Sequence, residues 1–400
     1  MRYTGYTHIH ITPQTIMKKT WPFLFYFLYY AAVSGVFPFA ALYYQSIGLS
    51  GAQVGILLGL APIVTLAGGP LLTGIADKTR QHKLVISLTM AGVILWALAV
   101  PLTYSFPILL ALIIYNALLS APINSLADSA TMAMLGEERS MYGRVRLGGA
   151  LGWGLMALFV GPIVENYGLV WIFWIFAIGM ALNLLVVQKF SFAQSTEQTS
   201  FWRGVGSLLS NPRWMLFLGI SLVAGLGMAS VNTYQFVYMA EIGASETIMG
   251  LSLFISTFFS EVPVMFFGDR LLKRFGAQGL LALGGGVVGA RLLLYAVFNF
   301  PAAILTLQLL HGFTFPIIWI AGVSYAHENA PPGLSATAQG LFGAAVFGVG
   351  SGLGAFLGGI VIGSLGGRGL YSIFGGFVLL ALFVLMVIQR RFTVEQARPA

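Results

Sequence analysis

Long apolar runs recur along the whole chain, and they restrict the possible fold more than any other feature. Each run has about 20 residues, the length that an α-helix needs to cross the hydrocarbon core of a bilayer. We therefore expect an all-α integral membrane protein with twelve transmembrane helices. The expected spans are 22–45, 52–75, 84–104, 107–132, 145–165, 169–189, 214–238, 246–268, 277–298, 302–325, 335–364 and 369–389.

The composition excludes several other classes of protein. Hydrophobic residues make up 58% of the chain and charged residues only 8%, which is too little polar surface for a water-soluble globule. The absence of cysteine excludes disulfides, thiol catalysis and cysteine metal sites. The five histidines show no metal-ligand spacing, so we expect no metal and no cofactor.

The distribution of basic residues predicts the orientation in the membrane. If both termini are cytoplasmic, almost all loop Lys and Arg residues fall on the inner side, and only Arg368 lies outside. The net charge of +8 is then a topology signal and not a footprint for nucleic acid. We expect a multi-pass protein of the cell (inner) membrane with both termini in the cytoplasm.

The longest polar interval divides the chain into two halves. The expected parts are a cytoplasmic N-terminal tail (1–21), a six-helix half (22–189), a cytoplasmic linker (190–213), a second six-helix half (214–389) and a cytoplasmic C-terminal tail (390–400).

The two halves look like repeats of one another. GLSGAQVG at 48–55 is echoed by GASETIMG at 243–250, and each copy leads to an acid–base pair at an inner loop. Parallel six-helix repeats are a transporter architecture, with the binding site near the bilayer midplane between them. The sequence therefore predicts two pseudo-symmetric halves.

Charged residues inside the expected spans of the first half are candidates for function. An ionisable group at this depth costs about 2.5–3.5 kcal/mol on insertion scales, so such residues persist when they pair or line a pathway. Asp128 and Arg146 form a possible pair, and Trp153 lies two turns beyond Arg146 on the same helix face. An aromatic face beside an acid suits a sugar ring or an aromatic solute, although Trp153 could equally fill a core. Arg144 lies near the inner end, where it can extend to the interface.

A second group of ionisable residues lies in the other half. Arg291 is close to the expected midplane and needs an anionic or carbonyl partner, which Glu261 or His311 on adjoining spans can supply. Glu and His can both titrate in the working range of a proton carrier. We predict a proton-coupling cluster of Glu261, Arg291 and His311, with a fixed ion pair that only holds helices together as the alternative.

Neutral polar and aromatic side chains in the spans are candidates for lining the same site. Each is also a residue that joins helices by hydrogen bonds or packing. These candidates are Tyr30, Asn116, Asn232, Gln235 and Trp319.

The first inner loop, TGIADKTRQHK at 73–83, resembles the loop motif of the major facilitator superfamily. Asp77, Lys78 and Lys83 match it, and MFFGDRLLKRFG at 265–276 resembles a degenerate second copy with Asp269 and Arg270. In that superfamily the motif links helix ends and gates the inner face. The resemblance implies the same gating role for these five residues.

Two further motifs resemble the lactose-permease-like and phenylpropionate-permease-like branches. GRVRLGGALGW at 143–153 is similar to the fifth-span pattern of lactose permease, which implies sugar-binding roles for Arg146 and Asp128 and a stacking role for Trp153. LHGFTFP at 310–316 is similar to the tenth-span pattern, which places His311 on the site histidine. Two departures matter: Thr314 stands where that family has its coupling glutamate, and Glu261 lies about one turn further toward the inside than that family's eighth-span acid.

We therefore expect a secondary transporter that works by alternating access and is not an enzyme. The expected activity is proton-coupled symport of a small organic solute: a sugar, a nucleoside or an aromatic carboxylate. A proton-driven efflux antiporter is the runner-up, and a non-transporting receptor or sensor is the alternative from another class. The expected partners are the solute, protons and the lipid bilayer, with a monomer as the working unit.

Overall fold

The computed structural model describes residues 13–192, 201–331 and 334–397, and every regular element in them is helical. Parts of both expected tails and of the expected linker lie outside the described residues. The first group of helices is α1 (Pro13–Val36), α2 (Ala40–Ser46), α3 (Gly51–Thr79), α4 (His82–Ala99), η1 (Val100–Leu102), α5 (Phe106–Ser120), α6 (Ile123–Leu135), η2 (Gly136–Met141), α7 (Tyr142–Tyr167) and α8 (Trp171–Val187).

The second group follows the interval around residues 193–200. It comprises α9 (Phe201–Leu209), α10 (Pro212–Glu241), α11 (Glu246–Ile255), η3 (Ser256–Glu261), α12 (Val262–Val297), α13 (Pro301–Leu307), η4 (Gln308–Phe313), α14 (Phe315–Glu328), α15 (Ser335–Gly343), η5 (Ala344–Gly350) and α16 (Ser351–Ala397). Glycines with positive φ, Gly276 in α12 and Gly366 in α16, mark points where the chain turns back between two helical stretches.

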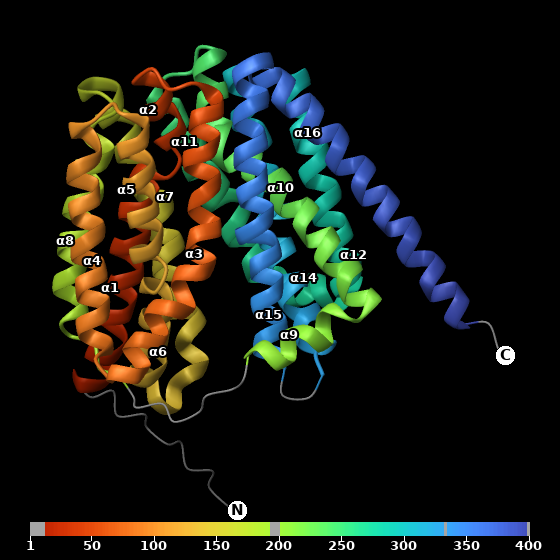
Figure 1. Cartoon of the computed structure of the whole chain (residues 1–400), viewed down its shortest axis with the longest axis horizontal. Coiled ribbons are helices and arrows are strands. Elements are labelled where there is room, and N and C mark those ends of the chain that lie inside the picture. Colours follow the sequence, from red (N-terminus) through yellow and green to blue (C-terminus); the bar gives the residue numbers. More distant parts are fainter. Residues whose placement is uncertain (1–12, 193–200, 332–333, 398–400) are drawn as a thin grey trace, which may run out of the picture.

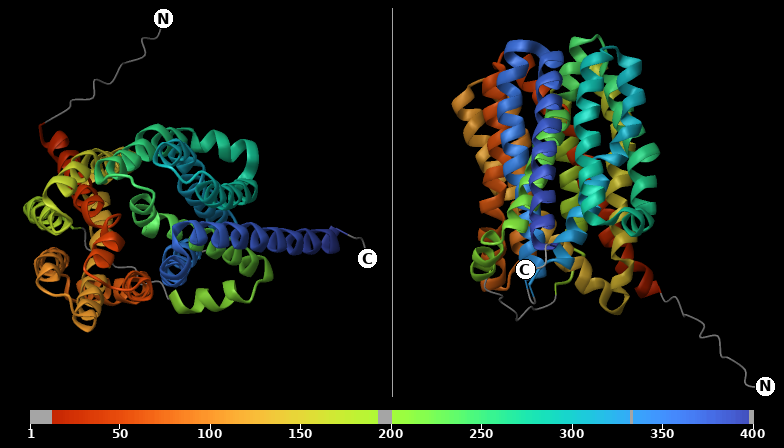
Figure 2. Two further views of the ribbon diagram at one scale, coloured as in Figure 1. Left: turned by 90° about the horizontal axis from the view of Figure 1, so that it is seen from above. Right: turned by 90° about the vertical axis from the view of Figure 1, so that its right-hand side faces the viewer.

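The helices gather in two neighbouring bundles (Figure 1). We call residues 13–192 the N-terminal bundle and residues 201–397 the C-terminal bundle. Figure 2 shows the same division from above, and the start of α1 and the end of α16 lie at one end of the molecule.

The helices have the length and the surface of membrane spans. Eight stretches are long and apolar enough to cross a bilayer, and three of them, with 62, 52 and 53 residues, are much longer than one crossing requires. Large apolar side chains are exposed, including Leu71, Leu185 and Phe266. The prediction of an all-α multi-pass membrane protein is therefore confirmed.

Within the N-terminal bundle, glycines bring α7 against α1. A Cβ atom on Gly148 would lie 2.6 Å from the Phe23 carbonyl oxygen, and one on Gly152 would collide with the Phe27 carbonyl. Small residues at membrane helix interfaces allow this close approach of backbones. The contact matters for function because it sets the distance between Tyr30 on α1 and Arg146 on α7.

We expect Gly152→Ala to lower the free energy of unfolding by about 1–3 kcal/mol, since the added methyl group overpacks this contact. Gly143→Ala on the same helix is the matched control, because a Cβ atom there meets nothing within 4 Å. The measurement is the thermal unfolding midpoint of both purified variants. Equal midpoints for the two variants would contradict the close α1–α7 contact.

Candidate functional site

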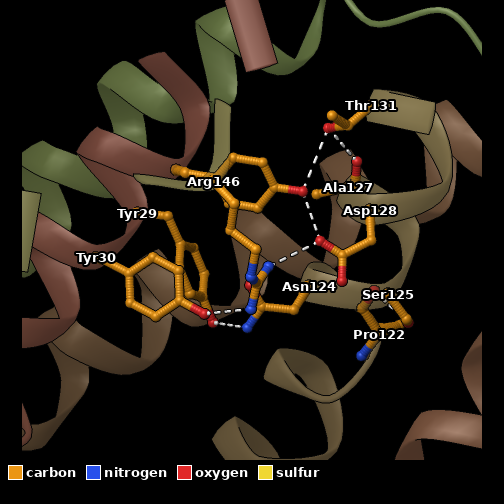
Figure 3. A network of polar contacts seen from close by, with 10 residues as sticks. Tyr29, Tyr30, Pro122, Asn124, Ser125, Ala127, Asp128, Thr131 and Arg146 are labelled. Atoms are coloured by element: carbon orange, nitrogen blue, oxygen red, sulfur yellow. Dashed lines mark hydrogen bonds and ion pairs between the residues drawn. The ribbon is translucent and has the colours of Figure 1, made fainter. Parts of the chain in front are cut away.

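The first polar cluster joins α1, α6 and α7 in the N-terminal bundle. The Asp128 carboxylate accepts a hydrogen bond from the Arg146 guanidinium at 2.9 Å, through the same oxygen that accepts one from the Tyr26 hydroxyl at 2.5 Å. A second Arg146 nitrogen donates to the Tyr30 hydroxyl at 3.1 Å, as Figure 3 shows. The structure thus brings together Asp128, Arg146 and Tyr30.

Neutral groups complete this cluster. Thr131 lies 3.3 Å from the Tyr26 hydroxyl, and Asn124 donates to the Tyr29 hydroxyl at 3.4 Å. The ion pair itself is only partly covered, with 38% of the Arg146 side chain and 35% of the Asp128 side chain exposed. An ion pair that is partly open in this way is accessible to a solute.

Three other candidates of the N-terminal bundle form no hydrogen bond to this cluster among the described residues. Trp153 is half-buried, with its ring 6.4 Å from the ring of Phe37. The side-chain oxygen of Asn116 is buried and has no hydrogen-bond partner. Arg144 is exposed and points to the Met141 sulfur at 3.7 Å, so it is separate from the Asp128–Arg146 pair.

The second polar cluster surrounds Arg291 in the C-terminal bundle. This residue is only 3% exposed, and its guanidinium donates to Gln308 at 2.6 Å and to the Tyr295 hydroxyl at 2.7 Å. Its third partner is the His311 Nδ1 atom at 3.3 Å. Among the described residues no carboxylate lies within the 4.0 Å ion-pair distance of Arg291. A buried guanidinium that lacks a carboxylate partner favours an anion nearby.

The three predicted coupling residues form a chain in which His311 is the middle member. Its Nε2 atom lies 3.6 Å from the Glu261 carboxylate, and its other ring nitrogen faces Arg291. Glu261 is the last residue of the π-helical segment η3, and His311 belongs to the 3₁₀ segment η4. The imidazole therefore connects the acid to the guanidinium.

A small hollow opens beside Arg291. Its lining combines polar and apolar side chains. The lining residues are Met228, Val231, Asn232, Val288, Arg291, His311, Thr314 and Phe315.

Two candidates of the C-terminal bundle lie elsewhere. Gln235 is buried and donates to Ser252 on α11 at 3.1 Å, so it joins two helices instead of lining this pocket. Trp319 is 40% exposed and lies against the rings of Phe347 and Phe342.

The two polar clusters adjoin across the contact between α7 and η3. A Cβ atom on Gly154 of α7 would lie 2.7 Å from the Phe258 ring and 3.0 Å from Thr257, both in η3. Tyr30 of the first cluster is within electrostatic reach of Glu261 of the second. A solute between the bundles could therefore contact both clusters.

The predicted loop residues make only local contacts. Asp77 pairs with His82 at 2.8 Å, and Lys83 donates to the Gln188 carbonyl at 2.9 Å, both within the N-terminal bundle. Lys78 and Asp269 are exposed, and Arg270 lies over the ring of Phe267 at 5.3 Å. No hydrogen bond or ion pair from these five residues to the other bundle is found in the described part of the chain.

Comparison with known proteins decides the family. The sequence model of the MFS_1 like family matches residues 21–373, which is most of the chain. The chain belongs to the major facilitator superfamily. The resemblance predicted from the loop and span motifs is thus confirmed, and this facilitator is a multi-pass membrane transporter.

Individual relatives agree with this assignment. The chain is 30% identical to the maltose permease of Geobacillus stearothermophilus over 94% of its own length and 95% of the permease. It is 22% identical to the probable 3-phenylpropionic acid transporter of Escherichia coli (strain K12), over 78% of the chain and 82% of the relative. The crystal structure of the nucleoside transporter NupG matches with a TM-score of 0.80 at 18% identity, and it covers 94% of this chain and 99% of NupG.

Proposed function

We propose that this facilitator crosses the membrane twelve times in two six-helix halves, 22–189 and 214–389. Counting each of the three longest apolar segments as two crossings and adding Trp171–Val187 supports this number. The linker 190–213 and the tails 1–21 and 390–400 would then be cytoplasmic. The shared end of the first and last described helices supports a common side for both termini (Figure 1).

We propose that it catalyses proton-coupled symport of a small organic solute by alternating access, as a monomer in the cell membrane. The observation that carries this proposal is the partly buried chain Arg291–His311–Glu261 beside a pocket and next to the Asp128–Arg146 pair. In this mechanism Glu261 or His311 carries the proton. The solute binds between the two clusters, with Trp153 and Tyr30 on one side and Asn232 on the other.

Two glycine-rich contacts support alternating access, because they close the end of the molecule opposite the termini. A Cβ atom on Gly55 of α3 would lie 2.7 Å from the Phe356 carbonyl of α16. A Cβ atom on Gly161 of α7 would lie 2.5 Å from the Glu246 carbonyl of α11. Because the backbones of the two bundles touch directly at these glycines, no large side chain has to move there. A small rotation of one bundle against the other can therefore open or close this end of the molecule.

Glu165 at the end of α7 adds a polar contact at this closed end. Its carboxylate accepts a hydrogen bond of 3.0 Å from the Thr247 backbone N–H, in the first turn of α11. A negative charge is favourable at a helix N-terminus by about 0.3–1 kcal/mol. We expect Glu165→Gln to raise the population open at this end roughly two- to fivefold.

The measurement is labelling of a cysteine at Asn232 by a membrane-impermeant thiol reagent, which the absence of native cysteine makes specific. Glu246→Gln is the matched control, because the structure assigns this neighbouring carboxylate no hydrogen bond to the other bundle among the described residues. Equal labelling in the two variants would contradict the role of Glu165.

The solute proposed first is a carboxylate with an apolar body. Arg291 has no carboxylate partner among the described residues, and Met228, Val231, Val288 and Phe315 supply an apolar wall. A neutral glycoside is the second candidate, since the maltose permease is similar over nearly the whole chain and Asp128 and Arg146 can bind hydroxyl groups. A nucleoside is the third.

A thermal-shift screen with 3-phenylpropionate, maltose and uridine separates these candidates. A ligand that binds only the folded state raises the apparent stability, by about 2.7 kcal/mol at 100 times its dissociation constant. We expect the largest rise in unfolding temperature with 3-phenylpropionate. A rise only with maltose or uridine would transfer the proposal to that class of solute.

Two alternatives predict different flux results. A proton-driven efflux antiporter would move protons and solute in opposite directions in the same vesicle assay. A receptor or sensor would bind a solute and show no uptake at all.

A further inference from the structure

Ser260 joins the two distorted segments that carry the coupling residues. It is 3% exposed, and its hydroxyl donates to the Leu309 carbonyl at 2.6 Å and accepts from the Gly312 backbone N–H at 2.6 Å. These two backbone groups are three residues apart, the pair that a 3₁₀ turn would join directly. One side-chain hydroxyl therefore ties η4 to η3 on both sides of His311.

Gly312 allows the close contact between Ser260 and the backbone of η4. A Cβ atom there would collide with the Ser260 backbone carbonyl and would lie 2.7 Å from the Val264 side chain. A third contact holds the same turn, since the Thr314 hydroxyl donates to the His311 carbonyl at 2.6 Å. The backbone around His311 is thus fixed against the backbone around Glu261.

The residues next to Ser260 and Gly312 in the sequence are the two members of the proposed proton pair. Glu261 directly follows Ser260, and His311 directly precedes Gly312. Their side chains are 3.6 Å apart, beyond a good hydrogen bond but within reach of one after a small movement. The separation of this pair therefore depends on how the two backbone segments are held.

We infer that Ser260 is a positioning residue, which sets the protonation equilibrium of Glu261 by fixing its distance from His311. The inference rests on the proposed function of this pair. The groups that face Glu261 are His311 from η4 and, at longer range, Tyr30 from α1, with Arg291 behind His311. Removal of the hydroxyl takes its hydrogen-bond partner from the Leu309 carbonyl and from the buried Gly312 N–H, so the segments shift to pair these groups again.

The experiment is infrared difference spectroscopy of the full chain in lipid as the pH is varied, without any solute. The band of the protonated Glu261 carboxyl group is assigned by its loss in Glu261→Gln. In Ser260→Ala we expect its pH midpoint to move by about one pH unit, a tenfold change in the protonation equilibrium. Ser260→Thr, which keeps the hydroxyl, restores most of the wild-type midpoint.

Ser256→Ala is the matched control. Ser256 is also buried in η3, but its hydroxyl bonds only to the Leu253 carbonyl within its own helix. A wild-type midpoint in Ser260→Ala, or an equal shift in Ser256→Ala, overturns the inference. If Ser260→Ala does not fold, Ser260→Cys decides by the same criterion, because a thiol is a weak hydrogen-bonding group of similar size. The outcome is independent of transport, so failed uptake would overturn the proposed function separately.

Discussion

Arg146→Ala is expected to abolish solute uptake into vesicles, with a loss of at least about 100-fold, whereas Arg144→Ala keeps uptake close to the wild-type rate. The physical reason is the charge left behind. The Asp128–Arg146 pair is more than one-third exposed, so solvent screens it, but a solute that hydrogen-bonds to the Arg146 charge would lose about 1.5–3 kcal/mol of binding. The Asp128 carboxylate would lose its charged partner and keep the hydrogen bond from the Tyr26 hydroxyl.

The two arginines are a matched pair on one helix, separated by a single residue. Arg144 is exposed and its side chain is directed to the Met141 sulfur, so its removal tests the loss of a positive charge on α7 without damage to the cluster. The measurement is uptake of labelled 3-phenylpropionate and maltose into vesicles that contain equal amounts of folded protein. Equal losses in both variants would contradict a binding role for Arg146.

Arg291→Ala is expected to be as severe, and Arg291→Lys is expected to rescue little of the activity. The guanidinium uses separate nitrogens to hold His311 and the Tyr295–Gln308 pair, and a lysine ammonium group cannot reproduce this planar fork. Loss of all three contacts leaves buried polar groups unpaired at about 1–3 kcal/mol each. We expect uptake to fall by at least about 100-fold in the alanine variant.

Arg274→Ala is the control for this second prediction. Arg274 lies in the same element but is exposed and rests over the ring of Phe275. Solute exchange and solute uptake should both fail in Arg291→Ala. The unfolding temperature and the yield of the purified variant show whether the protein is still folded. Normal uptake by a folded Arg291→Ala protein would contradict the assignment of the pocket.

The ionisable part of the candidate site could be predicted from the sequence because the background is almost free of charge. Asp128, Arg146, Glu261, Arg291 and His311 stand out in apolar runs, and the structure gathers them into two clusters. The all-helical fold follows for a related reason, since the apolar runs have the length of a membrane span.

The neutral partners could not be predicted in the same way. Tyr26, Tyr295 and Gln308 complete the two clusters, but Tyr and Gln are common in helices and carry no charge signal. Tyr26 lies one turn before Tyr30 on α1, and this spacing was the one available hint. Gln235 illustrates the alternative reading of a polar residue in a span, because its side chain hydrogen-bonds to Ser252 on a neighbouring helix.

The sequence also did not predict the geometry around Glu261. Adjoining spans indicated Glu261 or His311 as the partner of Arg291, and the structure places only His311 in direct contact. The π-helical turn before Glu261 and the 3₁₀ turn at His311 change the direction of both side chains. The Ser260–Gly312 hydrogen bond joins these two distorted segments, and local propensity does not encode a contact between distant parts of the chain.

The most direct test of the central claim is the pH change that a solute drives across vesicles containing the purified protein. With 3-phenylpropionate or maltose added outside, we predict that the wild-type protein moves protons inward together with the solute. Glu261→Gln and His311→Ala should lose this proton movement while solute exchange across the membrane continues. If both variants move protons at the wild-type rate, the assignment of proton coupling to the Arg291–His311–Glu261 chain is wrong.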